Sequence, residues 1–169
     1  NEKNISITVD VEEWFHTNWF DVDHIIDTYY DGIFPETDVV ESIQKLTNLF
    51  DNHNVQSTFF VLGETAKRYP EIIDLIRDDN HELACHGFYH NKKYDEQNQN
   101  SLKDFRSDIQ NFKKEISDNV KGFRFPNFAL TDNKLKILVE EGFIYDSSIV
   151  PCLHIPGWYG NSKFPIKPY

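Results

Sequence analysis

Residues 5–16 read ISITVDVEEWFH, and this stretch gives the first indication of the fold class. The β-branched residues Ile5, Ile7 and Val9 alternate with polar residues, a pattern that predicts a strand ending at Asp10. Acidic residues follow directly, and then come Trp14 and Phe15, which is not the composition of an ordinary turn. The stretch therefore predicts a strand whose carboxyl end carries ionisable side chains.

The same succession of an apolar strand and an amphipathic helix recurs along the chain. Further strands are expected over residues 55–62, 81–85, 122–125 and 143–145. Apolar residues at three- and four-residue spacing predict helices that begin near Asp38, Pro70, Ser101 and Thr131. Alternation of this kind is typical of βαβ units. We expect an α/β fold with a parallel sheet or barrel, in one domain over residues 1–169.

Composition narrows the range of partners. The 169 residues include 28 acidic and 17 basic side chains, which gives a net charge of −11. This balance argues against nucleic acid or an anionic membrane surface as the main partner. No apolar run approaches the roughly 18 residues of a spanning helix, and no signal peptide is visible at the start. We therefore expect no transmembrane segment and favour a cytoplasmic location over the cell envelope.

Two histidines, His86 and His90, lie four residues apart after the strand expected at 81–85. Two imidazoles at this spacing reach one point when the segment forms a helical turn or a tight loop. The pair is not the H-E-x-x-H of a metalloprotease, because the nearby acid, Glu82, precedes both histidines. The alternative interpretation is two surface histidines in a loop.

Asp10 and Glu12 flank Val11, so their carboxylates share one side of an extended backbone. One carboxylate can then serve as a metal ligand and the other as a general base. The alternative is an acidic cluster that complements the dipole at a helix entry.

Arg124 and Asp146 also follow predicted strand ends, as Asp10 and His86 do. In parallel α/β folds this is the face on which sites are built. A buried arginine beside a carboxylate can orient that group and hold it ionised, although a surface position is the commoner fate of an arginine. Asp146, in Tyr145-Asp146-Ser147-Ser148, is most simply interpreted as part of a turn.

Taken in order, these motifs resemble those of the NodB-homology polysaccharide deacetylases, carbohydrate esterase family 4. The similarity is closest to the branch that contains allantoinase-like and peptidoglycan-deacetylase-like members. The matching stretches are ITVDVEEWFH at 7–16, STFFVLG at 57–63, HELACHGFYH at 81–90, GFRFP at 122–126 and EEGFIYDSSIVP at 140–151. The resemblance implies a distorted, seven-stranded parallel (β/α) barrel. About five strands are present here, so we expect the barrel to be incomplete, without its C-terminal strands.

The resemblance also implies an activity, the metal-dependent removal of N-acetyl groups from a saccharide or polysaccharide. His86 and His90 match the family's metal-binding histidines, and Asp10 matches its catalytic base. Arg124 matches the arginine that orients this base. Glu12 occupies a position of the family's metal-binding aspartate, and Glu13 is a rival for the same role.

The remaining expectations concern the metal, the substrate and the general acid. Zinc is our first choice, although two histidines and one carboxylate also suit iron, cobalt or nickel. Trp14, His16 and Pro126 are expected to contact an N-acetylated saccharide. The family's general acid is a histidine of a late motif, which we expect beyond Tyr169, because His154 lies outside any such pattern.

Two other functions stay open at this point. A non-catalytic saccharide-binding scaffold is favoured by the glutamate at position 12 and by the missing late histidine. An amidohydrolase acting on a small linear or cyclic amide is the third possibility, by analogy with the allantoinase-like relatives.

Overall fold

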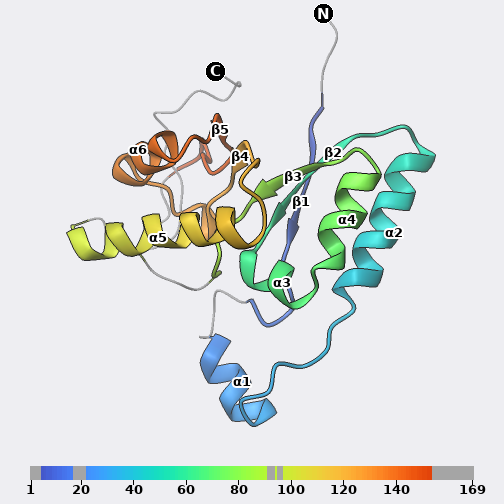
Figure 1. Ribbon diagram of the computed structural model, residues 1–169, viewed down its shortest axis with the longest axis horizontal. Helices are drawn as coiled ribbons and strands as arrows, with labels where there is room; N and C mark the ends of the chain where they lie inside the picture. Colours follow the sequence, from blue (N-terminus) through green and yellow to red (C-terminus); the bar gives the residue numbers. More distant parts are fainter. Residues whose placement is uncertain (1–4, 17–21, 91–93, 95–96, 154–169) are drawn as a thin grey trace, which may run out of the picture.

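The computed structural model describes residues 5–16, 22–90, 94 and 97–153, so His154 lies outside the described residues. Its centre is a parallel sheet in which consecutive strands are neighbours, in the order β1-β2-β3-β4-β5 (Figure 1). The predicted α/β class is therefore confirmed. The strands are β1 (Ile7–Val11), β2 (Ser57–Val61), β3 (Glu82–Cys85), β4 (Gly122–Phe123) and β5 (Tyr145–Asp146).

Helices connect each strand to the next. They are α2 (Val39–Asn52), α3 (Gly63–Arg68), α4 (Glu71–Asp78), α5 (Gln99–Glu115) and α6 (Asp132–Glu140), with a short 3-10 helix at Pro126–Phe128. In the described part of the chain, none of these helices combines the length and apolar character that a membrane crossing requires.

Several details differ from the sequence-based expectation. Strand β4 ends at Phe123 instead of residue 125, and β5 begins at Tyr145 instead of residue 143. Helix α1 (Val22–Tyr30) forms in a stretch for which no element was predicted. Helix α5 begins before Ser101, because the side chain of Asn98 caps it by accepting hydrogen bonds from the backbone N–H groups of Asn100 and Ser101.

The two faces of the sheet differ in character. Residues at one level of neighbouring parallel strands point to the same face. Val11, Val61, Cys85 and Phe123 are aligned in this way, and all four are buried in the main core, on the outer face that the helices cover. The opposite, inner face carries polar groups, as three residues earlier on β2 and β3, where Thr58 Oγ1 donates to Glu82 Oε2 at 2.7 Å.

The sheet is strongly curved towards its polar inner face. Arg124, which follows β4, donates from Nη1 to Thr8 Oγ1 at 3.1 Å and to Asp10 Oδ1 at 2.7 Å, both on β1. In a flat sheet, strands three positions apart would be separated by about 14 Å. The contact therefore requires the strands to curl as in a barrel wall. Within the described residues this wall has five strands, with β1 and β5 at its edges.

We predict that the aromatic core behind the sheet carries much of the stability. The ring of Phe105 on α5 is buried and lies 5.2 Å from Tyr94, 6.2 Å from Phe123 and 5.2 Å from Phe125, measured between centroids. Phe105→Ala should lower the free energy of unfolding by about 3–5 kcal/mol in urea titrations, because it leaves a cavity.

The matched control is Val139→Ala on α6, whose side chain is exposed. This variant should change stability by no more than about 0.5 kcal/mol. A Phe105→Ala protein as stable as the control would contradict the assignment of the core.

Candidate active site

Glu12, His86 and His90 come together at the carboxyl end of the sheet. Glu12 follows β1 directly, and His86 follows β3. Glu12 Oε1 lies 2.8 Å from His86 Nε2 and 3.1 Å from His90 Nε2. One ligand atom from each residue falls within 4.8 Å of the others, which is compact enough to surround one metal ion. The structure thus unites three residues that the sequence analysis singled out as ligands.

The orientation of His86 suits metal binding. Its Nδ1 lies 2.7 Å from the carbonyl oxygen of Arg124, and this contact assigns the N–H to Nδ1. Nε2 is then the ring atom directed at Glu12 and at the centre of the cluster, and it can offer its lone pair to a metal once it is deprotonated. Metal-binding histidines are commonly oriented by a second hydrogen bond of this kind. Two imidazole nitrogens and one carboxylate oxygen are donors that suit zinc and other divalent transition metals, so the residues present fit the metal that the sequence suggested.

Glu12 is held in its ionised form. Burial alone would raise the pKa of its carboxyl group, but hydrogen bonds to His86 and His90, together with their positive charge, outweigh burial and lower this pKa to about 2. The carboxylate is therefore charged at neutral pH, which is the form that a metal ligand requires.

Glu13 faces the other way and joins a different network. Both of its carboxylate oxygens accept hydrogen bonds from Arg68 Nη1, at 2.6 and 2.8 Å. The hydroxyl groups of Thr65 and Thr37 each donate to it at 3.1 Å. The side chain is fully buried and these four bonds occupy both oxygens, so the structure brings Glu12, and not Glu13, to the histidines.

The loop that carries both histidines is fixed by two carboxylates from neighbouring helices. Asp108 on α5 accepts from the backbone N–H of Phe88 at 2.9 Å, and Glu64 on α3 accepts from that of His90 at 3.0 Å. At Gly87 the loop adopts a positive φ of 83°, which favours glycine. Sequence analysis missed both carboxylates. For Asp108 a signal existed, since it lies on the apolar face of its helix, three residues after Phe105.

His16 lies beneath the histidine pair. Its Nδ1 accepts from the backbone N–H of Glu13 at 2.9 Å, and its Nε2 lies 3.2 Å from Glu64 Oε1. Its ring stacks on that of His90 with 5.6 Å between centroids and 24° between planes. The side chain has no exposed surface, so in this conformation it packs against a candidate ligand and does not face solvent.

Asp10 and Arg124 form an ion pair beside the cluster. Besides its bond to Asp10, Arg124 donates from Nη2 to Ser147 Oγ at 2.7 Å, and its guanidinium lies 4.1 Å from the centroid of Phe60. The side chain of Asp10 is 30% exposed, so an oriented carboxylate is open to solvent at the same edge of the sheet. Asp146 forms the predicted turn by accepting from Ser148 N–H and Oγ, and burial raises its pKa.

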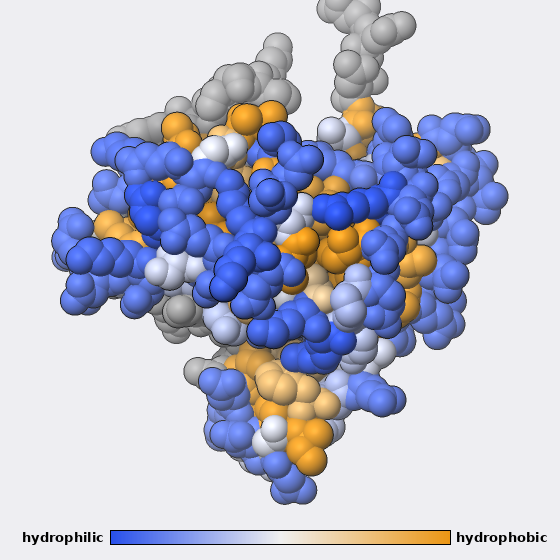
Figure 2. All heavy atoms as spheres, in the orientation of Figure 1, coloured by the Kyte–Doolittle hydropathy of each residue, from blue (hydrophilic) through white to orange (hydrophobic). Residues whose placement is uncertain are grey.

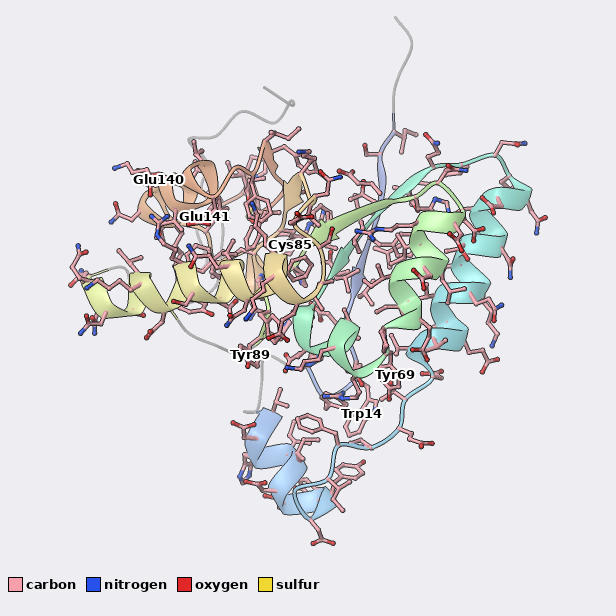
Figure 3. All side chains as sticks on the ribbon, viewed as in Figure 1. Trp14, Tyr69, Cys85, Tyr89, Glu140 and Glu141 are labelled. Carbon is pink, nitrogen blue, oxygen red and sulfur yellow. The ribbon has the colours of Figure 1, made fainter. Side chains whose placement is uncertain are left out.

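The other residues expected at the substrate lie in different environments. Trp14 is 55% exposed and lies between α1 and α3 (Figure 3). Pro126 is buried and faces Gly87, where an added Cβ would lie 3.7 Å from the proline ring. Of the three residues expected to contact a saccharide, Trp14 therefore presents the largest surface to solvent, whereas His16 and Pro126 support the loop that carries the histidines.

The fold and the site together define a class, a curved parallel α/β sheet with a candidate mononuclear metal centre at its carboxyl end. The sequence matches the family described as polysaccharide deacetylase over residues 20–145, which is more than half of the chain. The chain belongs to this family. The matched range contains His86, His90 and Arg124 but begins after Asp10 and Glu12, so the place of these two residues in the site rests on their geometry.

Three relatives illustrate the similarity. A peptidoglycan-N-acetylglucosamine deacetylase of Bacillus cereus is 29% identical over 112 residues, 62% of this chain and 38% of the relative. A crystal structure of a candidate polysaccharide deacetylase from Mycobacterium smegmatis is 25% identical, with a TM-score of 0.63 over 85% of this chain and 50% of that one. A family 4 carbohydrate esterase pseudoenzyme from Bacillus anthracis is 19% identical, with a TM-score of 0.62 over 86% of this chain and 43% of that one.

The chain thus spans half or less of the length of these relatives. The likeness to the pseudoenzyme shows the fold alone. Since this fold occurs in a pseudoenzyme as well as in a deacetylase structure, architecture does not separate an enzyme from a non-catalytic scaffold, and the side chains of the site must carry the argument.

We predict that Glu12→Gln and Glu13→Gln differ in their effect on zinc binding. Glu13→Gln removes the charge that compensates Arg68 and should lower the free energy of unfolding by about 2–4 kcal/mol, less than for a fully buried pair because Arg68 is partly exposed. Glu12→Gln should weaken zinc binding by at least about tenfold. It should also lower the metal-free stability, because the lowered pKa of Glu12 means that its carboxylate stabilises the folded state at neutral pH. Urea titrations with a chelator and competitive zinc titrations measure the two effects. Tight zinc binding in Glu12→Gln and weak binding in Glu13→Gln would reverse the assignment.

We also predict that Asp108 supports the metal centre without touching it. Asp108→Asn replaces a charge-assisted acceptor of the Phe88 N–H by a weaker one and should reduce zinc affinity by about 10-fold. Asp104→Asn on the same helix is the matched control, because no hydrogen bond from Asp104 to this loop is found among the described residues. Equal zinc affinity in the two variants would show that Asp108 does not position the histidines.

Proposed function

We propose that this chain forms the metal-binding part of a deacetylase that removes N-acetyl groups from a saccharide or polysaccharide. One observation carries the proposal: the Glu12–His86–His90 cluster lies at the same edge of the sheet as an aspartate, Asp10, that is oriented by Arg124. Membership of the polysaccharide deacetylase family supports the same conclusion. The Bacillus cereus relative acts, by its name, on peptidoglycan N-acetylglucosamine, so an N-acetylated amino sugar is the proposed substrate class.

Each residue of the candidate site has its own role in the proposed deacetylation. A divalent metal held by Glu12, His86 and His90, with zinc as the first choice, would polarise the acetamide carbonyl and make a bound water more acidic. Asp10 accepts the proton of the attacking water at its carboxylate, acting as a general base. Arg124 holds that carboxylate in position through the 2.7 Å bond to Oδ1. The leaving amine must also be protonated, and we assign this role to no residue of the described part.

A non-catalytic saccharide-binding domain is the second candidate. The observation in its favour is the glutamate at position 12, where the resemblance leads us to expect an aspartate. Glu12 nevertheless reaches both histidines within 3.1 Å, so its longer side chain does not prevent the cluster from forming.

A cytoplasmic location stays a prediction.

The test separates metal binding from turnover. The zinc-loaded protein in its natural full length should release acetate from oligomers of N-acetylglucosamine. Asp10→Asn in that protein should retain zinc while losing about 10²–10⁴-fold in kcat, the usual contribution of a general base. The His86→Ala, His90→Ala double variant should lose both zinc and acetate release. Metal content and acetate are measured on the same samples.

Three results would overturn parts of this proposal. Stoichiometric zinc in the double histidine variant would remove the metal assignment. Saccharide binding without acetate release by the zinc-loaded protein in its natural full length would favour the non-catalytic scaffold. Hydrolysis of small amides, with no activity on oligosaccharides, would point to an amidohydrolase.

A further inference from the structure

His16 lies against the candidate metal centre and has no part in the proposed chemistry. Its ring stacks on that of His90, with 5.6 Å between centroids and 24° between planes. Its side chain has no exposed surface. A buried polar ring in contact with a candidate ligand either belongs to the metal centre or supports it, and the contacts of its two nitrogens decide between these roles.

Both ring nitrogens of His16 already have neighbours. Nδ1 accepts a hydrogen bond from the backbone N–H of Glu13 at 2.9 Å, and this bond assigns the N–H of the ring to Nε2. Nε2 lies 3.2 Å from Glu64 Oε1, at ion-pair distance but without the alignment of a hydrogen bond. Since the lone pair of Nδ1 is used and Nε2 carries the proton, the ring offers no lone pair to a metal ion. His16 therefore lies beside the candidate ligands and not among them.

Glu64 connects His16 to the backbone of His90. The carboxylate oxygen that faces His16, Oε1, also accepts a hydrogen bond from the backbone N–H of His90 at 3.0 Å. Glu64 lies in the first turn of α3, and its own backbone N–H donates to the carbonyl oxygen of Phe88 at 2.9 Å. His90 is thus contacted at its ring by His16 and at its backbone by Glu64, and these two residues contact each other.

His16 is itself held from its other side. Its ring packs edge-on against that of Phe15, with 4.8 Å between centroids. Phe15 is fully buried in the small core that it forms with three apolar residues of α1. Figure 2 shows hydrophobic residues gathered on the lobe that contains α1, below the more polar body of the protein. The backbone N–H of His16 also donates to the carbonyl oxygen of Glu13 at 2.9 Å, which closes a turn. The ring is therefore in place before a metal ion binds.

A fixed neighbour restricts the ring of His90. A ring that stacks on another ring loses this contact when it rotates about its own Cβ–Cγ bond. Stacking on His16 therefore favours the orientation in which His90 Nε2 lies 3.1 Å from Glu12 Oε1. A ligand that is already oriented loses less conformational entropy when the metal binds, so the affinity for the metal is higher.

We propose that His16 is a positioning residue of the metal centre, which fixes the ring of His90 by stacking and its backbone through Glu64. This inference rests on the proposed function, because it takes His90 as a metal ligand. It extends that function by assigning part of the metal affinity to a buried histidine that contacts neither the metal nor the substrate.

The test measures zinc affinity and metal coordination in the protein in its natural full length. Competitive titration gives the zinc affinity, and the visible spectrum of the cobalt-loaded protein reports the geometry of the ligands. His16→Ala should bind one zinc ion with an affinity about 10- to 100-fold below that of the wild type, the range expected when an outer partner of a ligand is lost. Its cobalt spectrum should also change. A purely structural role would lower metal-free stability and leave the cobalt spectrum as in the wild type.

A second variant, His16→Gln, separates the ring from its polar contacts. The glutamine amide can accept from the Glu13 N–H and can face Glu64, but it returns no ring. His16→Gln should therefore recover most of the metal-free stability that His16→Ala loses in urea titrations, while its zinc affinity stays below that of the wild type. This comparison also tests the proposal where His16→Ala does not fold. His24→Ala is the matched control, because this histidine is exposed on α1, and it should bind zinc as the wild type does.

The outcomes separate this inference from the proposed function. Zinc binding that depends on His16, without acetate release by the wild type, would support the positioning role and overturn the deacetylase. Acetate release with equal zinc affinity and equal cobalt spectra in the wild type and His16→Gln would support the deacetylase and overturn the positioning role. Loss of stoichiometric zinc in His16→Gln, as expected for the double variant of His86 and His90, would make His16 a ligand and overturn the inference.

Discussion

Arg124 joins the parts of the molecule that the chemistry requires. Its side chain binds Asp10 at 2.7 Å, and its carbonyl oxygen lies 2.7 Å from His86 Nδ1. A single residue therefore positions both the proposed base and one candidate metal ligand. The guanidinium is largely removed from solvent, so this charge-assisted bond is screened less than a surface pair would be. Displacement of Arg124 would alter the curvature of the sheet and the site at the same time.

The alternation of side chains at the end of β1 separates two acidic residues with different tasks. Asp10 and Glu12 share the inner side, as an extended backbone requires, whereas Glu13 turns towards Arg68 of α3. The Glu13–Arg68 pair fixes the residue that lies between the candidate ligand Glu12 and Trp14. The metal centre, through Glu12, and the small core around α1, through Phe15, therefore depend on neighbouring residues of one short stretch. This explains why acidic and aromatic residues occur together there.

Sequence reasoning recovered what depends on short-range patterns. The strands and the βα alternation follow from apolar spacing. The grouping of Glu12 with His86 and His90 was implied by the resemblance to the polysaccharide deacetylases. Helix α1 was missed because its apolar face serves a small separate core instead of the sheet. The choice between Glu12 and Glu13 required Arg68, a partner 55 residues away, and the supporting role of Glu64 required the loop of His90. Such long-range polar contacts leave little periodic trace in a sequence.

A second side chain, Tyr145, also stabilises the curvature of the sheet, in addition to Arg124. Tyr145 on β5 passes over β4 at Gly122, where an added Cβ would lie 2.0 Å from its ring. Its hydroxyl reaches Glu82 and Thr58, and burial together with the hydrogen bond to Glu82 raises its pKa, so the group stays neutral and can donate. Glycine at 122 is thus required by space and not by backbone conformation. Since Arg124 spans from β4 to β1 and Tyr145 spans from β5 to β3 and β2, the polar side chains of the inner face hold the strands in the curve that brings the site residues together.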